Sequence, residues 1–183
     1  MANYIWHKVV CTKDDLDAYF IDNDPFDGNP SIGESYISFN RLFGVKSLDE
    51  YREKVDYNTI SYGHGFSWSK CENGLYEIKF CTRWNYPILA IIKAIELCHD
   101  LVWYSFDEAY EGVSRFFWDK TENKVTEYGF DPGFAFDVWE QENEYLWNVT
   151  QSPDDPMWLY LKNATVDWHP RREDNLITKY LKT

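Results

Sequence analysis

The segment 66–82 constrains the fold more than any other part of the chain. Alternating apolar and polar residues on both sides of Glu72-Asn73-Gly74 are typical of a β-hairpin. If these three residues form the loop, Trp68 pairs with Ile78, and the apolar side chains of both strands share one face. A two-residue loop would place them on opposite faces. We therefore predict an antiparallel hairpin in the first register, with Gly74 at a positive φ.

The elements on either side of this hairpin indicate a fold class. Residues 4–11 predict a strand, and Thr12 is the expected N-cap of the helix that follows. Pro87 opens a second helix with an apolar stripe at helical spacing, and residues 101–106 return as a strand. The order strand, helix, strand, strand, helix, strand predicts an α+β fold with a ferredoxin-like (βαββαβ) core.

Three additions to this core are expected. An insertion at 22–62 carries a helix that begins at Ser47, because Ser47-Leu48-Asp49-Glu50 matches a capping box. A second hairpin, 113–130, extends the sheet. A C-terminal helical extension follows, with short helices predicted at 137–147, 153–161 and 174–181. We thus expect a core domain over 1–130 and an acidic, aromatic extension over 131–183 that packs on it.

The four cysteines are expected to be buried free thiols. They contain no C-x-x-C pair, and the predicted register sets Cys71 and Cys81 at opposite ends of the hairpin. The first residues show no secretory signal, and no apolar run approaches the roughly 20 residues of a membrane span. These features favour a protein of the cytoplasm, where thiols stay reduced.

Charge narrows the possible partners. The chain carries 31 acidic and 18 basic residues, a net charge of −13. Direct binding of a nucleic-acid backbone needs clustered lysine and arginine, and an anionic membrane repels such a chain, so we expect neither as a partner. The acids are concentrated, because residues 125–161 contain no Lys, Arg or His. A solvated face explains such a run, and so does a docking surface for a basic partner.

The candidate docking residues are the acids and tryptophans of this base-free window. Aromatic side chains on a surface act as binding anchors. The set comprises Glu127, Asp131, Asp137, Glu140, Glu142, Glu144, Asp154, Asp155, Trp139, Trp147 and Trp158.

A second candidate site lies around Arg83 and Trp84. Arginine there can bind an anion with the tryptophan as a stacking wall; alternatively, Trp84 packs under the following helix and Arg83 pairs with an acid. Asp107, Glu108 and Glu111 cluster after a strand and complete a possible ligand pocket, or form a solvated acidic turn. The glycine-rich spot Gly63-His64-Gly65 either frees the backbone for a ligand or forms the loop into the hairpin.

No catalytic, metal or cofactor motif is present in the sequence. The chain lacks both glycine-rich phosphate-binding patterns and a G-x-S-x-G elbow. The four histidines have no partner at metal-ligand spacing. We therefore expect a non-enzymatic protein without cofactor or metal.

Two segments carry a family resemblance. Thr82-Arg83-Trp84 closes a strand before a helix, and Tyr104 is followed by Asp107-Glu108 and Glu111-Gly112. With the Met-Ala-Asn start, these segments resemble the YubB ferredoxin-like domain family of phages and mobile plasmids. The resemblance covers roughly residues 66–130 and implies a fold and a mobile-element origin, not an activity.

These observations lead to one functional hypothesis with two alternatives. The first is an accessory protein of a phage or mobile element that inhibits a basic, nucleic-acid-binding host defence complex through an acidic surface, in the manner of some anti-CRISPR proteins. An immunity protein against a basic nuclease toxin fits the same acids. A small ligand-binding or enzymatic module would instead use Arg83, Trp84 and the acidic cluster.

Overall fold

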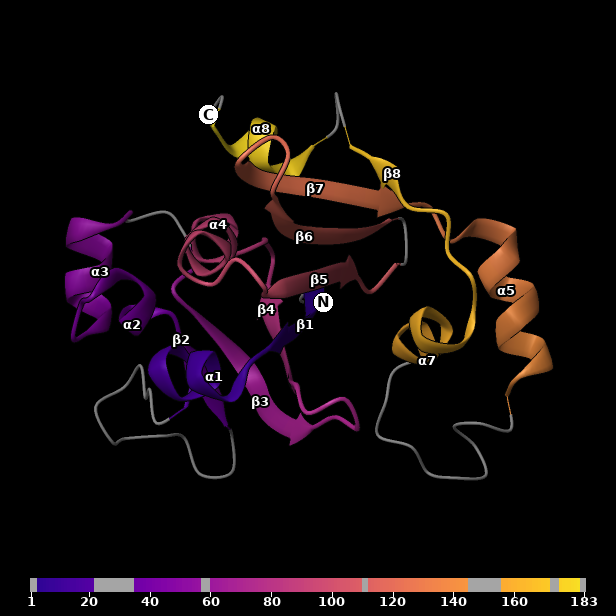
Figure 1. The fold of residues 1–183 in the computed structure, drawn as a ribbon, viewed down its shortest axis with the longest axis horizontal. Helices are drawn as coiled ribbons and strands as arrows, with labels where there is room; N and C mark the ends of the chain where they lie inside the picture. The colour runs from indigo at the N-terminus through magenta and orange to yellow at the C-terminus, as the bar shows by residue number, and fades with distance from the viewer. Residues whose placement is uncertain are drawn as a thin grey trace.

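The computed structural model describes residues 3–21, 35–56, 60–109, 112–144, 156–171 and 175–181. Its architecture is a mixed α+β fold around one open, antiparallel, eight-stranded sheet in the order β2-β3-β4-β1-β5-β6-β7-β8 (Figure 1). The strands are β1 (Tyr4–Cys11), β2 (Tyr36–Ser38), β3 (Tyr62–Lys70), β4 (Tyr76–Arg83), β5 (Val102–Asp107), β6 (Val113–Asp119), β7 (Lys124–Phe130) and β8 (His169–Pro170).

The hairpin register predicted from the sequence is confirmed. Trp68 pairs with Ile78 across β3 and β4, and Gly74 has a φ of +84°. The ladder is interrupted by a bulge between His64 and Ser67, where Gly65 has a φ of +65°. The second half of β3 projects beyond the core, so Trp68 remains 46% exposed.

Local capping signals also place two helices correctly. Thr12 caps α1 (Lys13–Tyr19) in a reciprocal capping box with Asp15. Ser47 caps α3 (Leu48–Lys54), and its hydroxyl accepts a hydrogen bond from the Glu50 amide at 3.1 Å. The insertion holds more structure than the single helix predicted, because it also contributes β2 and α2 (Asn40–Phe43).

One face of the sheet is covered by helices on the left of Figure 1. Helix α4 (Ile88–Leu97) lies at the centre of this layer with α1, α2 and α3 beside it, and α8 (Leu176–Leu181) contacts α4. The core on this face is mainly aliphatic and includes Val9, Ile78, Ile91 and Ile95. All four cysteines are free, as predicted, and Cys11, Cys81 and Cys98 are buried, whereas Cys71 is only half-buried, contrary to the prediction.

The other face is covered by the C-terminal segment, on the right of Figure 1. Helices α5 (Gly133–Glu142) and α7 (Pro156–Asn163) contact each other, and α7 lies nearer the strands. The core here is largely aromatic: the rings of Phe106 and Trp158 lie 4.6 Å apart and those of Phe136 and Tyr160 5.3 Å apart. Helix α5 starts earlier than the predicted 137–147, because the turn at Asp131-Pro132 already initiates it.

The sheet is larger than the predicted core with one added hairpin. Strand β2, of three residues, extends it beyond β3, and β8, of two residues, extends it beyond β7. Neither strand was predicted from the sequence, and both are short. None of the described helices is long and apolar enough to cross a membrane.

Candidate functional site

A cavity of about 290 Å³ lies where the ends of β3 and β4 meet α3. We call it the Arg83 pocket. Cationic and aromatic side chains dominate its wall, and among the described residues that line it there is no aspartate or glutamate. These lining residues are Arg52, Ile60, Ser61, Tyr62, His64, Arg83 and Trp84.

The sheet register positions Arg83 and His64 in this pocket. Arg83 ends β4 directly opposite Tyr4, and its guanidinium lies 5.7 Å from the centre of the Tyr4 ring. His64 pairs with Cys81 on the same side of the sheet, and its ring lies 5.3 Å from Tyr62. Arg83 and His64 therefore face away from α4, and Arg52 of α3 completes the pocket.

Trp84 follows β4 in a left-handed conformation with a φ of +70°. A bulky residue rarely adopts this conformation, which costs roughly 1–2 kcal/mol. The Trp84 amide donates a hydrogen bond to the Asn3 carbonyl at 2.8 Å, and the turn leaves the indole 67% exposed. The exposed indole contradicts the alternative in which Trp84 packs under the helix.

A chain of buried hydrogen bonds stabilises the turn at Trp84. The Trp103 indole N–H donates to His7 Nδ1 at 3.2 Å, so this nitrogen accepts and His7 Nε2 carries the proton. Nε2 then donates to the Thr82 hydroxyl at 2.9 Å, which in turn donates to the Asn85 carbonyl at 2.8 Å. Complete burial of His7 lowers its pKa from 6.5 to about 3, so the ring is neutral at physiological pH.

The acids expected to complete this pocket lie elsewhere. Arg83 pairs with Tyr4, whereas Asp107 pairs with Ile5, and neighbouring residues of a strand point to opposite faces. Asp107 therefore lies on the other side of the sheet from Arg83, where its carboxylate accepts a hydrogen bond from the Ala109 amide at 3.0 Å. Glu108 is exposed and does not line the pocket. Glu111 lies outside the described residues.

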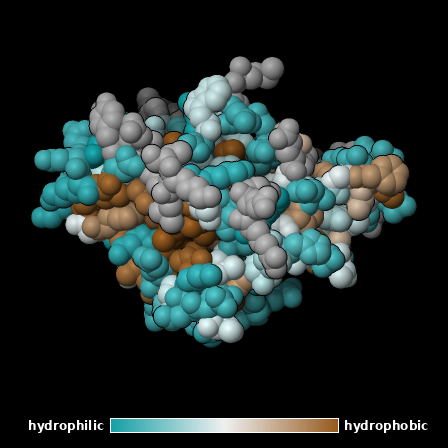
Figure 2. Space-filling view, turned by 90° about the horizontal axis from the view of Figure 1, so that it is seen from above, coloured by the Kyte–Doolittle hydropathy of each residue, from teal (hydrophilic) through white to brown (hydrophobic). Residues whose placement is uncertain are grey.

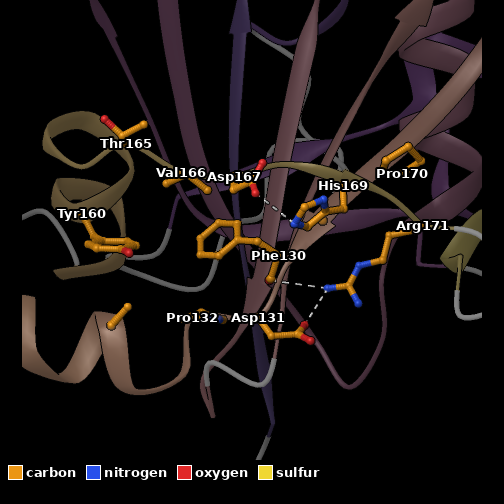
Figure 3. A pocket seen from close by; sticks show the side chains of 12 residues that line it. Phe130, Asp131, Pro132, Tyr160, Thr165, Val166, Asp167, His169, Pro170 and Arg171 are labelled. Atoms are coloured by element: carbon orange, nitrogen blue, oxygen red, sulfur yellow. Dashed lines mark hydrogen bonds and ion pairs between the residues drawn. The ribbon is translucent and has the colours of Figure 1, made fainter.

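A second cavity, of about 580 Å³, lies between β7, β8 and the segment that leads from α7 to β8 (Figure 3). We call it the Arg171 pocket. Arg171 points to Asp131, with Nη2 3.0 Å from the carboxylate, and His169 lies 3.4 Å from Asp167. The Arg171 side chain also lies against Gly129, where an added Cβ would come within 1.9 Å of Nε. Arg171 and His169 thus each face an acid of the chain itself.

Glu127 is not part of an acidic surface, contrary to the prediction. Only 1% of it is exposed, and it accepts hydrogen bonds from the Ser114 hydroxyl at 2.7 Å and the Leu176 amide at 2.6 Å. Burial raises the pKa of this carboxyl, and these hydrogen bonds oppose the shift. Its role is structural, because it ties the start of α8 to β7.

Trp158 is likewise buried, at 4% exposure, and so is not a surface anchor. Its ring packs on Phe106, and the Lys8 ammonium lies 4.9 Å from its centre. Trp139 is half-buried on the aromatic core beside Tyr160. Trp147, Asp154 and Asp155 lie outside the described residues.

The remaining predicted acids gather on and beside α5. Asp131, Asp137, Glu142 and Glu144 are exposed, and Glu140 is half-buried. Sequence reasoning missed Phe134, which is 81% exposed at the start of the same helix. Phe134 lies in the base-free window, which was the one sequence feature that could have identified it. The sequence pattern does not show that Phe134 points outward and Phe136 inward.

The described residues contain no group of three His, Cys, Asp or Glu side chains that could hold a metal ion. Comparisons with protein-family models, curated proteins and solved structures found no match.

Proposed function

We propose that this chain is a non-enzymatic accessory protein of a phage or mobile element that docks on a basic, nucleic-acid-binding host protein. The docking face is the outer face of α5. It comprises Phe134, Asp137, Val138, Gln141 and Glu142, which follow the i, i+3, i+4, i+7, i+8 spacing of one helical face.

The observation that carries this proposal is the exposure of Phe134 beside acids on an outlying helix. Helix α5 lies beyond α7, at the right-hand margin of the molecule, and apolar atoms reach the surface at that end in Figure 2. An exposed aromatic side chain gives a partner a desolvated anchor. Asp137 and Glu142 around it are complementary to a basic partner and steer its approach.

The ferredoxin-like core and the family membership are part of the same proposal. Strands β3, β4, β1 and β5 are neighbours in that order, which is the order of a split βαβ sheet. The Thr82-Arg83-Trp84 segment ends β4 shortly before α4, as the resemblance to the YubB family implies. These placements support a mobile-element origin, and the docking face supports an inhibitory role.

The test compares two variants with matched charge changes. Phe134→Ala combined with Asp137→Lys and Glu142→Lys alters the docking face. The control variant, Glu53→Lys with Glu96→Lys, alters exposed acids of α3 and α4, on the side of the sheet away from α5. Each protein is used to capture partners from nuclease-treated host lysate over a salt series, and duplex DNA is added as competitor.

We expect the wild type and the α3/α4 variant to retain a basic nucleic-acid-binding protein that DNA displaces. The α5 variant should lose it, and binding should weaken steeply with salt. A captured nuclease toxin would support the immunity-protein alternative instead. Equal capture by all three proteins would show that the docking face is not α5.

A further inference from the structure

The Arg83 pocket has a local charge opposite to that of the whole chain. The protein carries a net charge of −13, yet the described pocket wall presents two arginines and a histidine without a carboxylate. Among the described residues, Arg52 forms an ion pair with Asp49 at 3.9 Å, and both side chains are so exposed that the pair contributes little. An anion placed between Arg52 and Arg83 would gain charge-assisted hydrogen bonds.

The same pocket presents aromatic surface. The Trp84 indole is 67% exposed, and Tyr62 and His64 also line the wall, with Tyr36 5.2 Å from His64. Flat, exposed aromatic rings stack on nucleobases, which gives affinity with little sequence preference. Cations and rings are thus combined within one cavity.

We propose that the Arg83 pocket binds a nucleoside monophosphate, with the phosphate between Arg52 and Arg83 and the base stacked on Trp84. The cavity volume of about 290 Å³ is near the lower limit of small-molecule sites, which suits one nucleotide. A single phosphate needs one or two cations, whereas a nucleic-acid backbone needs an extended basic stripe. The site is therefore compatible with a strongly acidic protein.

The backbone at Trp84 gives independent support. Folding does not require an indole at this position, because the side chain is mostly exposed and the positive φ disfavours it. Strained residues cluster at ligand sites, where the surrounding structure fixes them. Here the chain from Trp103 through His7 and Thr82 to Asn85 provides that rigid support.

Isothermal titration calorimetry of the full chain with adenosine monophosphate, adenosine and inorganic phosphate tests the proposal. Arg83→Gln and Trp84→Ala are the variants. Lys120→Gln and Trp68→Ala are matched controls, because Lys120 lies in the β6–β7 turn and Trp68 on the opposite face of the sheet. Thermal melting of all four variants verifies that each is folded.

We expect the monophosphate to bind the wild type and both controls, and each pocket variant to weaken binding by about tenfold or more. Adenosine and phosphate alone should each bind about tenfold more weakly than the monophosphate. Absence of binding at millimolar monophosphate, or equal binding by wild type and pocket variants, would overturn the proposal. Tighter binding of a 5′-phosphorylated oligonucleotide would overturn the assignment to a free nucleotide. None of these outcomes depends on α5, so they leave the docking proposal untouched.

Discussion

The Arg83 pocket and the Arg171 pocket are built from similar residues but differ in charge balance. Each contains an arginine, a histidine and aromatic rings. In the Arg171 pocket, the arginine faces Asp131 and the histidine faces Asp167. In the Arg83 pocket, Arg83 lies over a tyrosine ring, Arg52 has only the exposed Asp49 at 3.9 Å, and the described wall holds no acid.

This difference separates a structural contact from a binding site. In the Arg171 pocket, the ion pair and the hydrogen bond from Arg171 to the Phe130 carbonyl attach the C-terminal segment to β7. In the Arg83 pocket, the rigid part is the hydrogen-bond chain below the surface, and Arg83 and Arg52 above it are exposed to solvent. Five predictions test this contrast.

The largest expected effect concerns the histidine below the Arg83 pocket. His7→Leu removes the acceptor of the Trp103 N–H and the donor to Thr82, and it should lower the free energy of unfolding by about 3 kcal/mol. The exposed His169 is the matched control, and His169→Leu should change that energy by less than about 0.5 kcal/mol. Urea denaturation measures both, and equal losses would contradict the contrast.

The same residue predicts a pH dependence. The pKa of His7 is about 3 in the folded chain and near 6.5 in the unfolded chain. Between these values the unfolded state binds a proton that the folded state does not, so stability is lost as pH falls from 6.5 towards 3. Unfolding free energies of His7→Leu should fall less steeply over this range than those of the wild type.

The two arginines should respond differently to neutralisation. Arg171→Gln loses a partner at 3.0 Å and should destabilise the chain by about 1.5 kcal/mol. Arg83→Gln removes an exposed cation and should change stability by less than about 0.5 kcal/mol. Thermal and urea unfolding measure the two effects, and a larger loss at Arg83 would show that its role is structural.

Gly129→Ala tests the ion pair between Arg171 and Asp131, because the Arg171 side chain packs against Gly129. The new Cβ would displace the guanidinium from Asp131, at a cost of about 1 kcal/mol. Because both changes disrupt one contact, the double variant Gly129→Ala/Arg171→Gln should be less destabilised than the sum of the single variants. Full additivity in urea unfolding would contradict this account.

The smallest expected effect is a gain in stability. Trp84→Gly relieves the positive φ, the greater freedom of glycine in the unfolded chain offsets part of this gain, and the free energy of unfolding should rise by about 0.5 kcal/mol. The same variant should lose nucleotide binding. A stability loss in differential scanning calorimetry would indicate that the indole contributes to folding rather than to binding.

Local signals in the sequence were sufficient for much of the central sheet. Strand β1, the caps of α1 and α3 and the register of the β3–β4 hairpin depend on residues close in sequence, and each was predicted. Strands β2 and β8 and helix α2 were not, because their short segments form only through pairing or packing with distant residues. The ferredoxin-like core stays a prediction.

The candidate site was predicted only in part for the same reason. Arg83 and Trp84 are adjacent in the chain, so a motif could identify them. Arg52 and His64 join them only through tertiary packing. Asp107 was misplaced because its face depends on the register of β5 against β1, which no local pattern specifies. The burial of Glu127 and Trp158 likewise depends on how the C-terminal segment folds back.

The short strands at both edges of the sheet have a consequence for self-association. An open sheet exposes unpaired backbone groups at its margins, which can recruit strands from other copies and grow into aggregates. Here one margin is β2, of three residues, and the other is β8, of two residues with a proline that cannot donate to a ladder. As outermost strands, β2 and β8 themselves therefore offer an incoming strand a template of no more than three residues.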